Sequence, residues 1–149
     1  MNKKSIIITI AIFIVLVALF LLWRFVIGFK LTTESKFRNV VKNISDMSVY
    51  IVGNDDQRVE IDNSDDVNEI LDTLATAKVK RTTDLWIGGA YRIDFVNNKT
   101  NDVVKVIVHP VQVRMFGKVY SFCNADNNVY QKIKEILKKY IGESTAFTN

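Results

Sequence analysis

Residues 6–23 read IIITIAIFIVLVALFLLW, a run of eighteen residues without a charge, a glycine or a proline. A helix rises about 1.5 Å per residue, so this run spans roughly 27 Å, close to the hydrocarbon thickness of a bilayer. The apolar character resumes after Arg24, which extends the expected helix over residues 5–29. A chain of 149 residues is too small to bury such a helix in its core. The sequence therefore predicts a transmembrane anchor that follows a short basic tail, residues 1–4.

A secretory signal peptide is the main alternative to an anchor. Signal peptides have a shorter apolar region, about 7–15 residues, followed by a cleavage site of small residues. Here the longer run continues as LLWRFVIGFK, which offers no such site, and the single cysteine, Cys123, is too distant for a lipoprotein. We therefore predict an uncleaved anchor in contact with the lipid bilayer. The residues expected at the membrane interface are Lys3, Lys4, Trp23, Arg24 and Lys30.

The two ends of the anchor give conflicting signals for orientation. Lys3 and Lys4 precede it, whereas Arg24, Lys30, Lys36 and Arg38 follow it, so a count of basic residues favours a cytoplasmic C-terminal side. A very short basic N-terminal tail, however, commonly stays inside while the following domain is exported. We expect an extracytoplasmic domain, with a cytosol-facing regulatory domain as an alternative.

Three regions follow the anchor. Residues 30–44 are expected to form a juxtamembrane linker or short amphipathic helix, lying on the bilayer or on the domain. Residues 45–142 are expected to form one α+β domain, and residues 143–149 a flexible tail.

Hydrophobic periodicity predicts the order ββα-ββββ-α within the domain. The first predicted helix covers residues 65–77, with Asp66 and Glu69 as a capping box and Lys78 and Lys80 at its C-terminal end. The second covers residues 129–141, with Asp126 before its start and Gly142 after its end. Residues 82–89 are expected to be a loop. The predicted strands cover residues 49–51, 59–61, 91–95, 103–108, 111–116 and 118–122. We expect an antiparallel sheet with 103–108 central and both helices packed on one face.

The charges are almost balanced overall but unevenly placed. Residues 30–149 carry 17 basic and 16 acidic side chains. Residues 55–72 hold eight acids and one base, whereas residues 78–118 hold eight bases and three acids. Balanced charge does not favour nucleic acid as a partner. A small basic patch for such a ligand remains an alternative: Arg92, Lys105, Arg114, Lys118 and Tyr120.

No catalytic constellation is visible in the sequence. His109 is the only histidine, and Cys123 has no base beside it and is expected to be a small core residue. Asp62, Ser64 and Asp66 begin like a calcium loop, but Val67 and Thr73 stand where that loop requires Gly and Glu. We therefore expect a protein that is not an enzyme and has no cofactor or metal. The alternative is an envelope enzyme with a carboxylate site drawn from Asp62, Asp65, Asp66 and Asp94.

The segment LWIGGA, residues 85–90, is unusually apolar for a loop. An exposed tryptophan and isoleucine beside two glycines would make a natural anchor for a partner. The predicted partner-binding residues are Trp86, Ile87, Gly88, Gly89, Tyr91 and Arg92. The alternative is that this loop covers the end of the core or touches the membrane.

Residues 44–141 resemble a family of small, uncharacterised membrane-anchored extracytoplasmic domains of low-GC Gram-positive bacteria. The resemblance rests on VEIDNSDDVNEILDTL, YRIDFVNNKTNDVVKVIV, KVYSF and the terminal amphipathic helix, and the chain departs from the pattern at HPVQVRMFG. It implies export and a non-enzymatic role. Together these features predict a single-pass module that binds another envelope or membrane protein or an envelope component.

Overall fold

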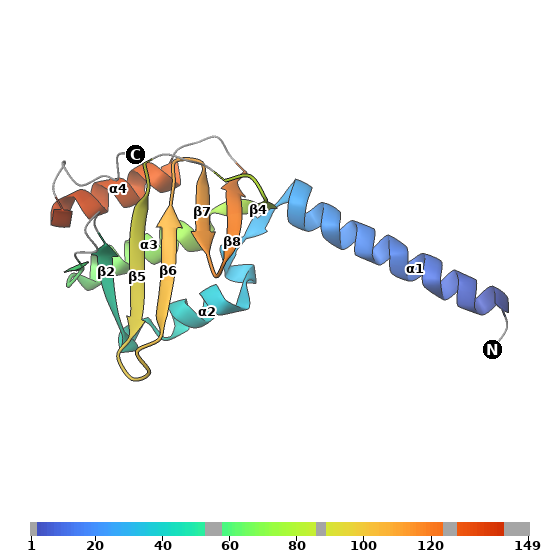
Figure 1. Ribbon diagram of the computed structural model, residues 1–149, viewed down its shortest axis with the longest axis horizontal. Coiled ribbons are helices and arrows are strands. Elements are labelled where there is room, and N and C mark those ends of the chain that lie inside the picture. Colours follow the sequence, from blue (N-terminus) through green and yellow to red (C-terminus); the bar gives the residue numbers. More distant parts are fainter. Residues whose placement is uncertain (1–2, 53–57, 86–88, 124–127, 142–149) are drawn as a thin grey trace.

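The computed structural model describes residues 3–52, 58–85, 89–123 and 128–141, except the side chain of Phe25. A long helix, α1, extends away from the other described residues, which fold into an antiparallel sheet with helices packed on it (Figure 1). The helical elements are α1 (Lys3–Leu22), the π-helix η1 (Trp23–Ile27), the 3-10 helices η2 (Leu31–Thr33) and η3 (Ile44–Asp46), α2 (Ser35–Lys42), α3 (Ser64–Thr76) and α4 (Asn128–Ile141). The fold is α+β, as predicted.

Within the described residues, eight strands form one antiparallel sheet in the order β1-β4-β8-β7-β6-β5-β2-β3. Because β6 lies between β5 and β7, the prediction of a central strand at residues 103–108 is confirmed. The strands are β1 (Phe29–Lys30), β2 (Met47–Val52), β3 (Arg58–Glu60), β4 (Lys78–Thr82), β5 (Tyr91–Asn97), β6 (Val103–Val108), β7 (Gln112–Met115) and β8 (Lys118–Phe122).

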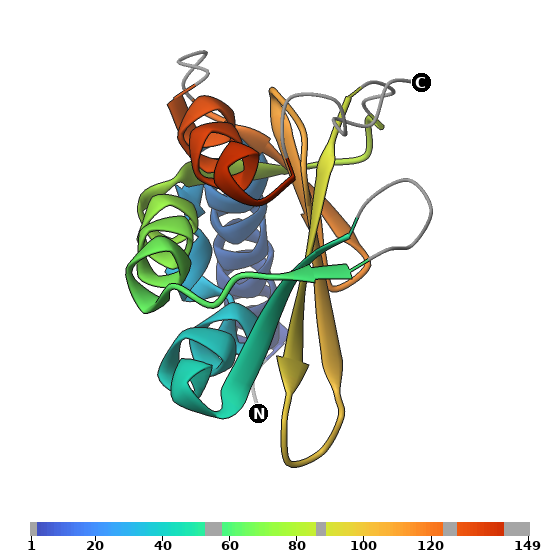
Figure 2. The same cartoon turned by 90° about the vertical axis from the view of Figure 1, so that its left-hand side faces the viewer.

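The helices α2, α3 and α4 lie on one face of the sheet, which is seen edge-on in Figure 2. Alternate side chains of each strand point into this layer, as the two-residue repeat of a strand requires. Phe95 and Val106 of the sheet are fully buried there, as are Leu74 of α3 and Ile133 of α4. The predicted packing of the helices on one face is confirmed.

The folded domain begins earlier than the sequence suggested. Leu31 and Phe37 are fully buried, and Val40 is 3% exposed in the same hydrophobic core. Residues 30–44 are thus not a linker, because their apolar side chains complete the domain core. The amphipathic helix was expected to lie either on the bilayer or on the domain, and the structure shows it packed on the domain.

Two local predictions around α3 were wrong. Lys78 and Lys80 do not complement the C-terminal end of a helix, because both belong to β4. The N-cap is Asn63 rather than Asp66: the Asn63 Oδ1 atom accepts a hydrogen bond from the Asp65 N–H at 2.8 Å and a longer one from the Asp66 N–H. The Asn63 cap begins the helix at Ser64, and this frees the Asp66 carboxylate for a tertiary contact.

The junction between α1 and the sheet is tightly built at Gly28. Its φ of +83° lies in the left-handed region, and a Cβ added there would be 2.4 Å from the Cys123 Sγ atom and 2.8 Å from the Val79 carbonyl oxygen. Only glycine fits such a position. The half-buried Cys123 therefore packs against the backbone of this junction.

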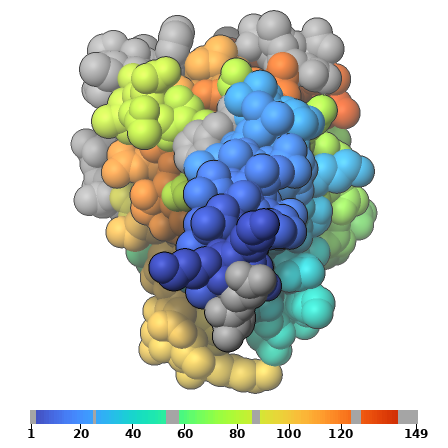
Figure 3. Space-filling view, turned by 90° about the vertical axis from the view of Figure 1, so that its right-hand side faces the viewer, coloured from blue at the N-terminus to red at the C-terminus, as the bar shows by residue number. Residues whose placement is uncertain are grey.

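α1 is long and apolar enough to be a membrane anchor or a signal sequence, and none of its residues is buried. It leaves the domain at the β1–β4 edge and runs roughly parallel to the plane of the sheet (Figures 1 and 2). Seen from the side of α1, the blue helix stands in front of the domain (Figure 3). The two faces of the sheet therefore point sideways with respect to the axis of α1.

Candidate functional site: the open face of the sheet

The face of the sheet opposite α2, α3 and α4 carries no helix among residues 3–52, 58–85, 89–123 and 128–141; we call it the open face. Cross-strand partners project on the same side of a sheet, so the register defines the composition of this face. One row crosses all the strands except β1. It consists of Arg58, Val52, Arg92, Ile107, Arg114, Val119 and Thr82.

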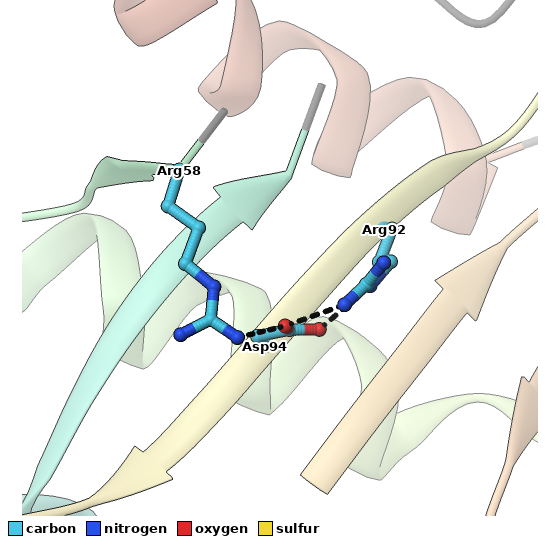
Figure 4. Close-up of polar contacts among 3 residues, drawn as sticks. All are labelled: Arg58, Arg92 and Asp94. Atoms are coloured by element: carbon cyan, nitrogen blue, oxygen red, sulfur yellow. Dashed lines mark hydrogen bonds and ion pairs between the residues drawn. The ribbon is translucent and has the colours of Figure 1, made fainter. Parts of the chain in front are cut away.

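Asp94 lies in the neighbouring row and is fully buried beneath two arginines. Arg92 donates from Nε to Oδ1 and from Nη2 to Oδ2 of Asp94, both at 2.9 Å, and the Arg58 Nη2 atom lies 3.3 Å from Oδ2. Figure 4 shows the two guanidinium groups approaching the carboxylate from opposite sides. Two cations against one anion leave this cluster with a formal charge of +1. The arrangement fixes the guanidinium groups, whose side chains are 44% exposed for Arg58 and 23% for Arg92.

Further cations on the open face are exposed to solvent. Lys105 is paired in register with Asp94, Arg114 with Ile107, and Lys80 with Ser121. The buried Val52 lies between Arg58 and Arg92 in the main row, and the half-buried Ile107 lies between Arg92 and Arg114. The open face is therefore an amphipathic, cationic surface, suited to a partner that carries negative charge.

The predicted partner-binding residues have different outcomes. Trp86, Ile87 and Gly88 lie outside the described residues, and Gly89 is half-buried. Tyr91 is 2% exposed, and its ring centroid lies 5.5 Å from that of Tyr130. Tyr91 is therefore a core residue whose ring is not available to a partner. This corrects the prediction for Tyr91. Arg92 projects onto the open face, because neighbouring side chains of a strand point to opposite sides.

The alternative basic patch is also divided by the sheet. Arg92, Lys105 and Arg114 share the open face, whereas Tyr120 is fully buried on the face that α2, α3 and α4 cover, which we call the covered face. Lys118 lies on that same side, where its Nζ atom is 3.5 Å from Glu34. The five residues do not form one patch.

The acidic residues of the alternative catalytic site do not converge either. Asp94 is on the open face, whereas Asp66 is on the helical side, where it accepts hydrogen bonds from Lys139 Nζ at 2.6 Å and from Tyr140 Oη at 2.7 Å. These hydrogen bonds hold the pKa of Asp66 below its usual range. Burial and the Asp66 carboxylate raise the pKa of Tyr140 to about 12. Asp66 thus joins α3 to α4.

Asp65, Glu69 and Asp72 are exposed on α3, and Asp62 is exposed just before the N-cap of this helix. We call these four residues the acidic ridge. Asp65, Glu69 and Asp72 line a groove of about 650 Å³ between α3 and α4, and Lys78 and Lys132 line the same groove. Among the described residues, no group of three or more His, Cys, Asp or Glu side chains could hold a metal ion.

The expected interface residues include one that binds the domain instead. Lys3, Lys4 and Lys30 are exposed, and Trp23 is 37% exposed with its ring 5.8 Å from that of Phe29. Arg24 is only 13% exposed: it forms an ion pair with Glu34 and its guanidinium carbon lies 4.1 Å from the centroid of the Phe29 ring. The charge of Arg24 is therefore compensated by the domain, rather than directed only to headgroups.

Glu34 links the end of the apolar helix to the sheet. Burial alone would raise the pKa of Glu34, but the hydrogen bond from Arg24 and the charges of Arg24 and Lys118 outweigh it and lower that pKa. Burial and the neighbouring Glu34 carboxylate raise the pKa of the Tyr120 hydroxyl to about 12. Charged groups from η1, β8 and the start of α2 thus meet at one point.

Comparisons with protein families, with curated proteins and with solved structures found no match for this chain. The resemblance to membrane-anchored extracytoplasmic domains therefore stays a prediction.

Part of the open face can be recognised from the sequence. The alternation in YRIDF places Arg92 and Asp94 on the same side of a strand, opposite Tyr91 and Phe95. The contact between Arg58 and Asp94 has no such signal, because it joins residues 36 positions apart through the pairing of β3 with β2 and of β2 with β5.

Proposed function

We propose that the protein is a single-pass, membrane-anchored and non-catalytic binding module whose domain lies at the outer face of the cell membrane. It binds another envelope or membrane protein, or an envelope component, through the open face of the sheet. The observation that carries the proposal is the row of cations on this face, in which the buried Asp94 orders Arg58 and Arg92 and aliphatic side chains lie between the cations.

The contacts of Arg24 support a lasting anchor. A signal sequence that is cleaved would remove the helix from which Arg24 reaches Glu34 and Phe29. Glu34 would then be a mostly buried carboxylate without its principal cation, which costs free energy. The outward orientation rests on the short basic N-terminal tail.

Protease accessibility tests the orientation. A tag placed after Asn149 should be digested in intact cells if the domain is outside. Protection in intact cells, with digestion only after lysis, would instead support the cytosol-facing alternative. Envelope components would then be excluded as partners of the domain.

The envelope-enzyme alternative has weaker support, because its four carboxylates are divided between the two sides of the sheet. A binding surface requires no such convergence. It requires exposed groups in a fixed arrangement, which the antiparallel register supplies across β5, β6 and β7.

Site-specific photocrosslinking tests the binding surface. A photoreactive amino acid at Ile107 should capture a partner in intact cells, whereas the same group at Lys42, exposed on α2, should not. The variant Arg114→Glu should remove the Ile107 adduct because it reverses a neighbouring charge.

The matched control for this change is Lys42→Glu, which makes the same reversal on the helical side. Equal capture from positions 107 and 42, or an adduct at position 107 that survives Arg114→Glu, would contradict the assignment of the open face as the binding surface.

A further inference from the structure

We infer that the partner of the open face is the acidic ridge of a second copy of this chain, so that neighbouring domains associate head to tail along the membrane. This inference rests on the proposed function, because it names the occupant of the same face. It also accounts for the separation of acidic and basic stretches along the sequence.

The two surfaces have opposite charge and lie on opposite sides of one domain. The four acids of the acidic ridge are exposed on α3 and just before it, and they outnumber the two lysines, Lys78 and Lys132, of the adjoining groove. Helix α3 itself packs on the covered face through Ile70 and Leu74. The exposed cations Arg58, Lys80, Lys105 and Arg114 lie on the other side of the sheet.

The spacing within each surface also matches. Arg92 and Arg114 are separated by two strand-to-strand steps, or about 10 Å at roughly 4.8 Å per step. Asp65 and Asp72 are seven residues apart on α3, which also corresponds to about 10 Å at roughly 1.5 Å per residue. The helix of one copy can thus lie across the strands of the next, with its acids along the row of cations.

Overall charge does not oppose the association of copies. Residues 30–149 carry 17 basic and 16 acidic side chains, so two domains repel each other little at long range. The separated charges on the two sides favour one orientation of approach. Each exposed ion pair contributes little by itself, so the contact depends on several pairs acting together.

The direction of α1 makes this contact compatible with a membrane. Because α1 runs roughly parallel to the sheet, both surfaces face sideways when α1 spans the bilayer (Figures 1 and 2). A translation along the membrane then brings the open face of one copy against α3 of the next while all the anchors stay parallel. Such a contact is heterologous and can repeat. The shared anchor plane also raises the effective concentration of copies.

Crosslinking of the full-length protein in membranes tests the inference. Two tagged copies carry Cys123→Ser, and one of them also carries Lys105→Cys and the other Glu69→Cys. With a short bis-maleimide reagent, the mixed sample should give several-fold more dimer than either cysteine variant alone. A predominance of 105-to-105 dimers would overturn the inference, because it would show a symmetric contact.

Charge exchange provides the specificity control. Arg114→Glu should reduce the mixed crosslink several-fold when it is placed in the Lys105→Cys copy, and Asp72→Lys in the Glu69→Cys copy should restore it. Glu135→Lys makes the same charge change on the exposed side of α4 and should not restore it. A mixed crosslink that ignores these charges would contradict the inference.

The photocrosslinking experiment separates the two proposals. If no mixed dimer forms but the Ile107 adduct still depends on Arg114, the open face binds a different partner and only this inference fails. If both signals are absent, the open face is not a binding surface and the proposed function fails with it.

Discussion

On the face of the sheet that α2, α3 and α4 cover, Ile93, Phe95 and Val106 are fully buried, whereas on the open face Lys105 and Arg114 are exposed to solvent. The charged groups at the margins of the covered side have partners from distant elements. Asp66 joins α3 to α4, and Glu34 joins η1 to β8.

On the open face, Asp94 holds two arginines in place, while other cations remain exposed. The difference indicates that charge has two uses in this domain. Charges on the covered side connect elements and stabilise the fold, whereas exposed charges on the open face are available to a partner. Substitutions on the two sides should therefore have different effects on stability and on binding.

The largest loss of stability is expected for Phe37→Ala. Phe37 is fully buried, and removing a core phenylalanine side chain typically costs about 3–5 kcal/mol of unfolding free energy. Denaturant unfolding of the full chain in detergent measures this, with Lys42→Ala as the exposed control on the same helix. Equal stabilities of the two variants would mean that α2 is not part of the domain core.

Asp94→Ala should have the next largest effect. It leaves two guanidinium groups without their carboxylate, and we expect a loss of about 2–3 kcal/mol, reduced by the partial exposure of Arg58 and Arg92. Asp72→Ala, an exposed change, should stay within about 0.5 kcal/mol of the unchanged protein. If both variants unfold alike, Asp94 does not order the open face.

Asp66→Asn should change the dependence of stability on pH. The pKa of Asp66 is lowered in the folded state, so the unfolded chain binds a proton at a higher pH than the folded chain does. The contribution of Asp66 is therefore present above the ordinary pKa of an aspartate and is lost as the pH falls through the lower, folded pKa. Unfolding free energies measured across the acid range should fall less steeply for Asp66→Asn. An unchanged slope would show that the contacts with Lys139 and Tyr140 do not stabilise the carboxylate.

The smallest effect on stability is expected for Arg114→Glu, on the open face. Because Arg114 is exposed, the change should shift the unfolding free energy by no more than about 0.5 kcal/mol while it removes the Ile107 adduct. Thermal unfolding and photocrosslinking of the same preparation measure both quantities. A large loss of stability would show that Arg114 stabilises the fold. The charges of the open face would then not differ in role from those of the covered side.

Much of the fold could be predicted from local patterns. The apolar stripe of α4 and the alternation in β5 are strong signals, because each repeats over several residues. Strand β4 was missed since its alternation, KVKRT, carries three basic residues that resemble a helix end. Strand β1 has only two residues and is defined by its pairing with β4, which no local pattern records.

Less of the open face could be predicted from the sequence. The sequence places Arg92 on a strand, but the row that contains Arg58 and Arg114 depends on the register of several strand pairs. The prediction of Tyr91 as a contact residue failed for a related reason. Tyr91 follows an apolar loop, but the alternation of its strand turns it toward α4.

The close fit at Gly28 has a mechanical consequence. With its backbone held against Val79 and Cys123, the end of the apolar helix cannot swivel independently of β4. A rotation of α1 about its own axis would therefore turn the whole domain by the same angle. One residue step of a helix corresponds to about 100°, so a small change in how α1 packs against another membrane helix would redirect the open face toward a different neighbour.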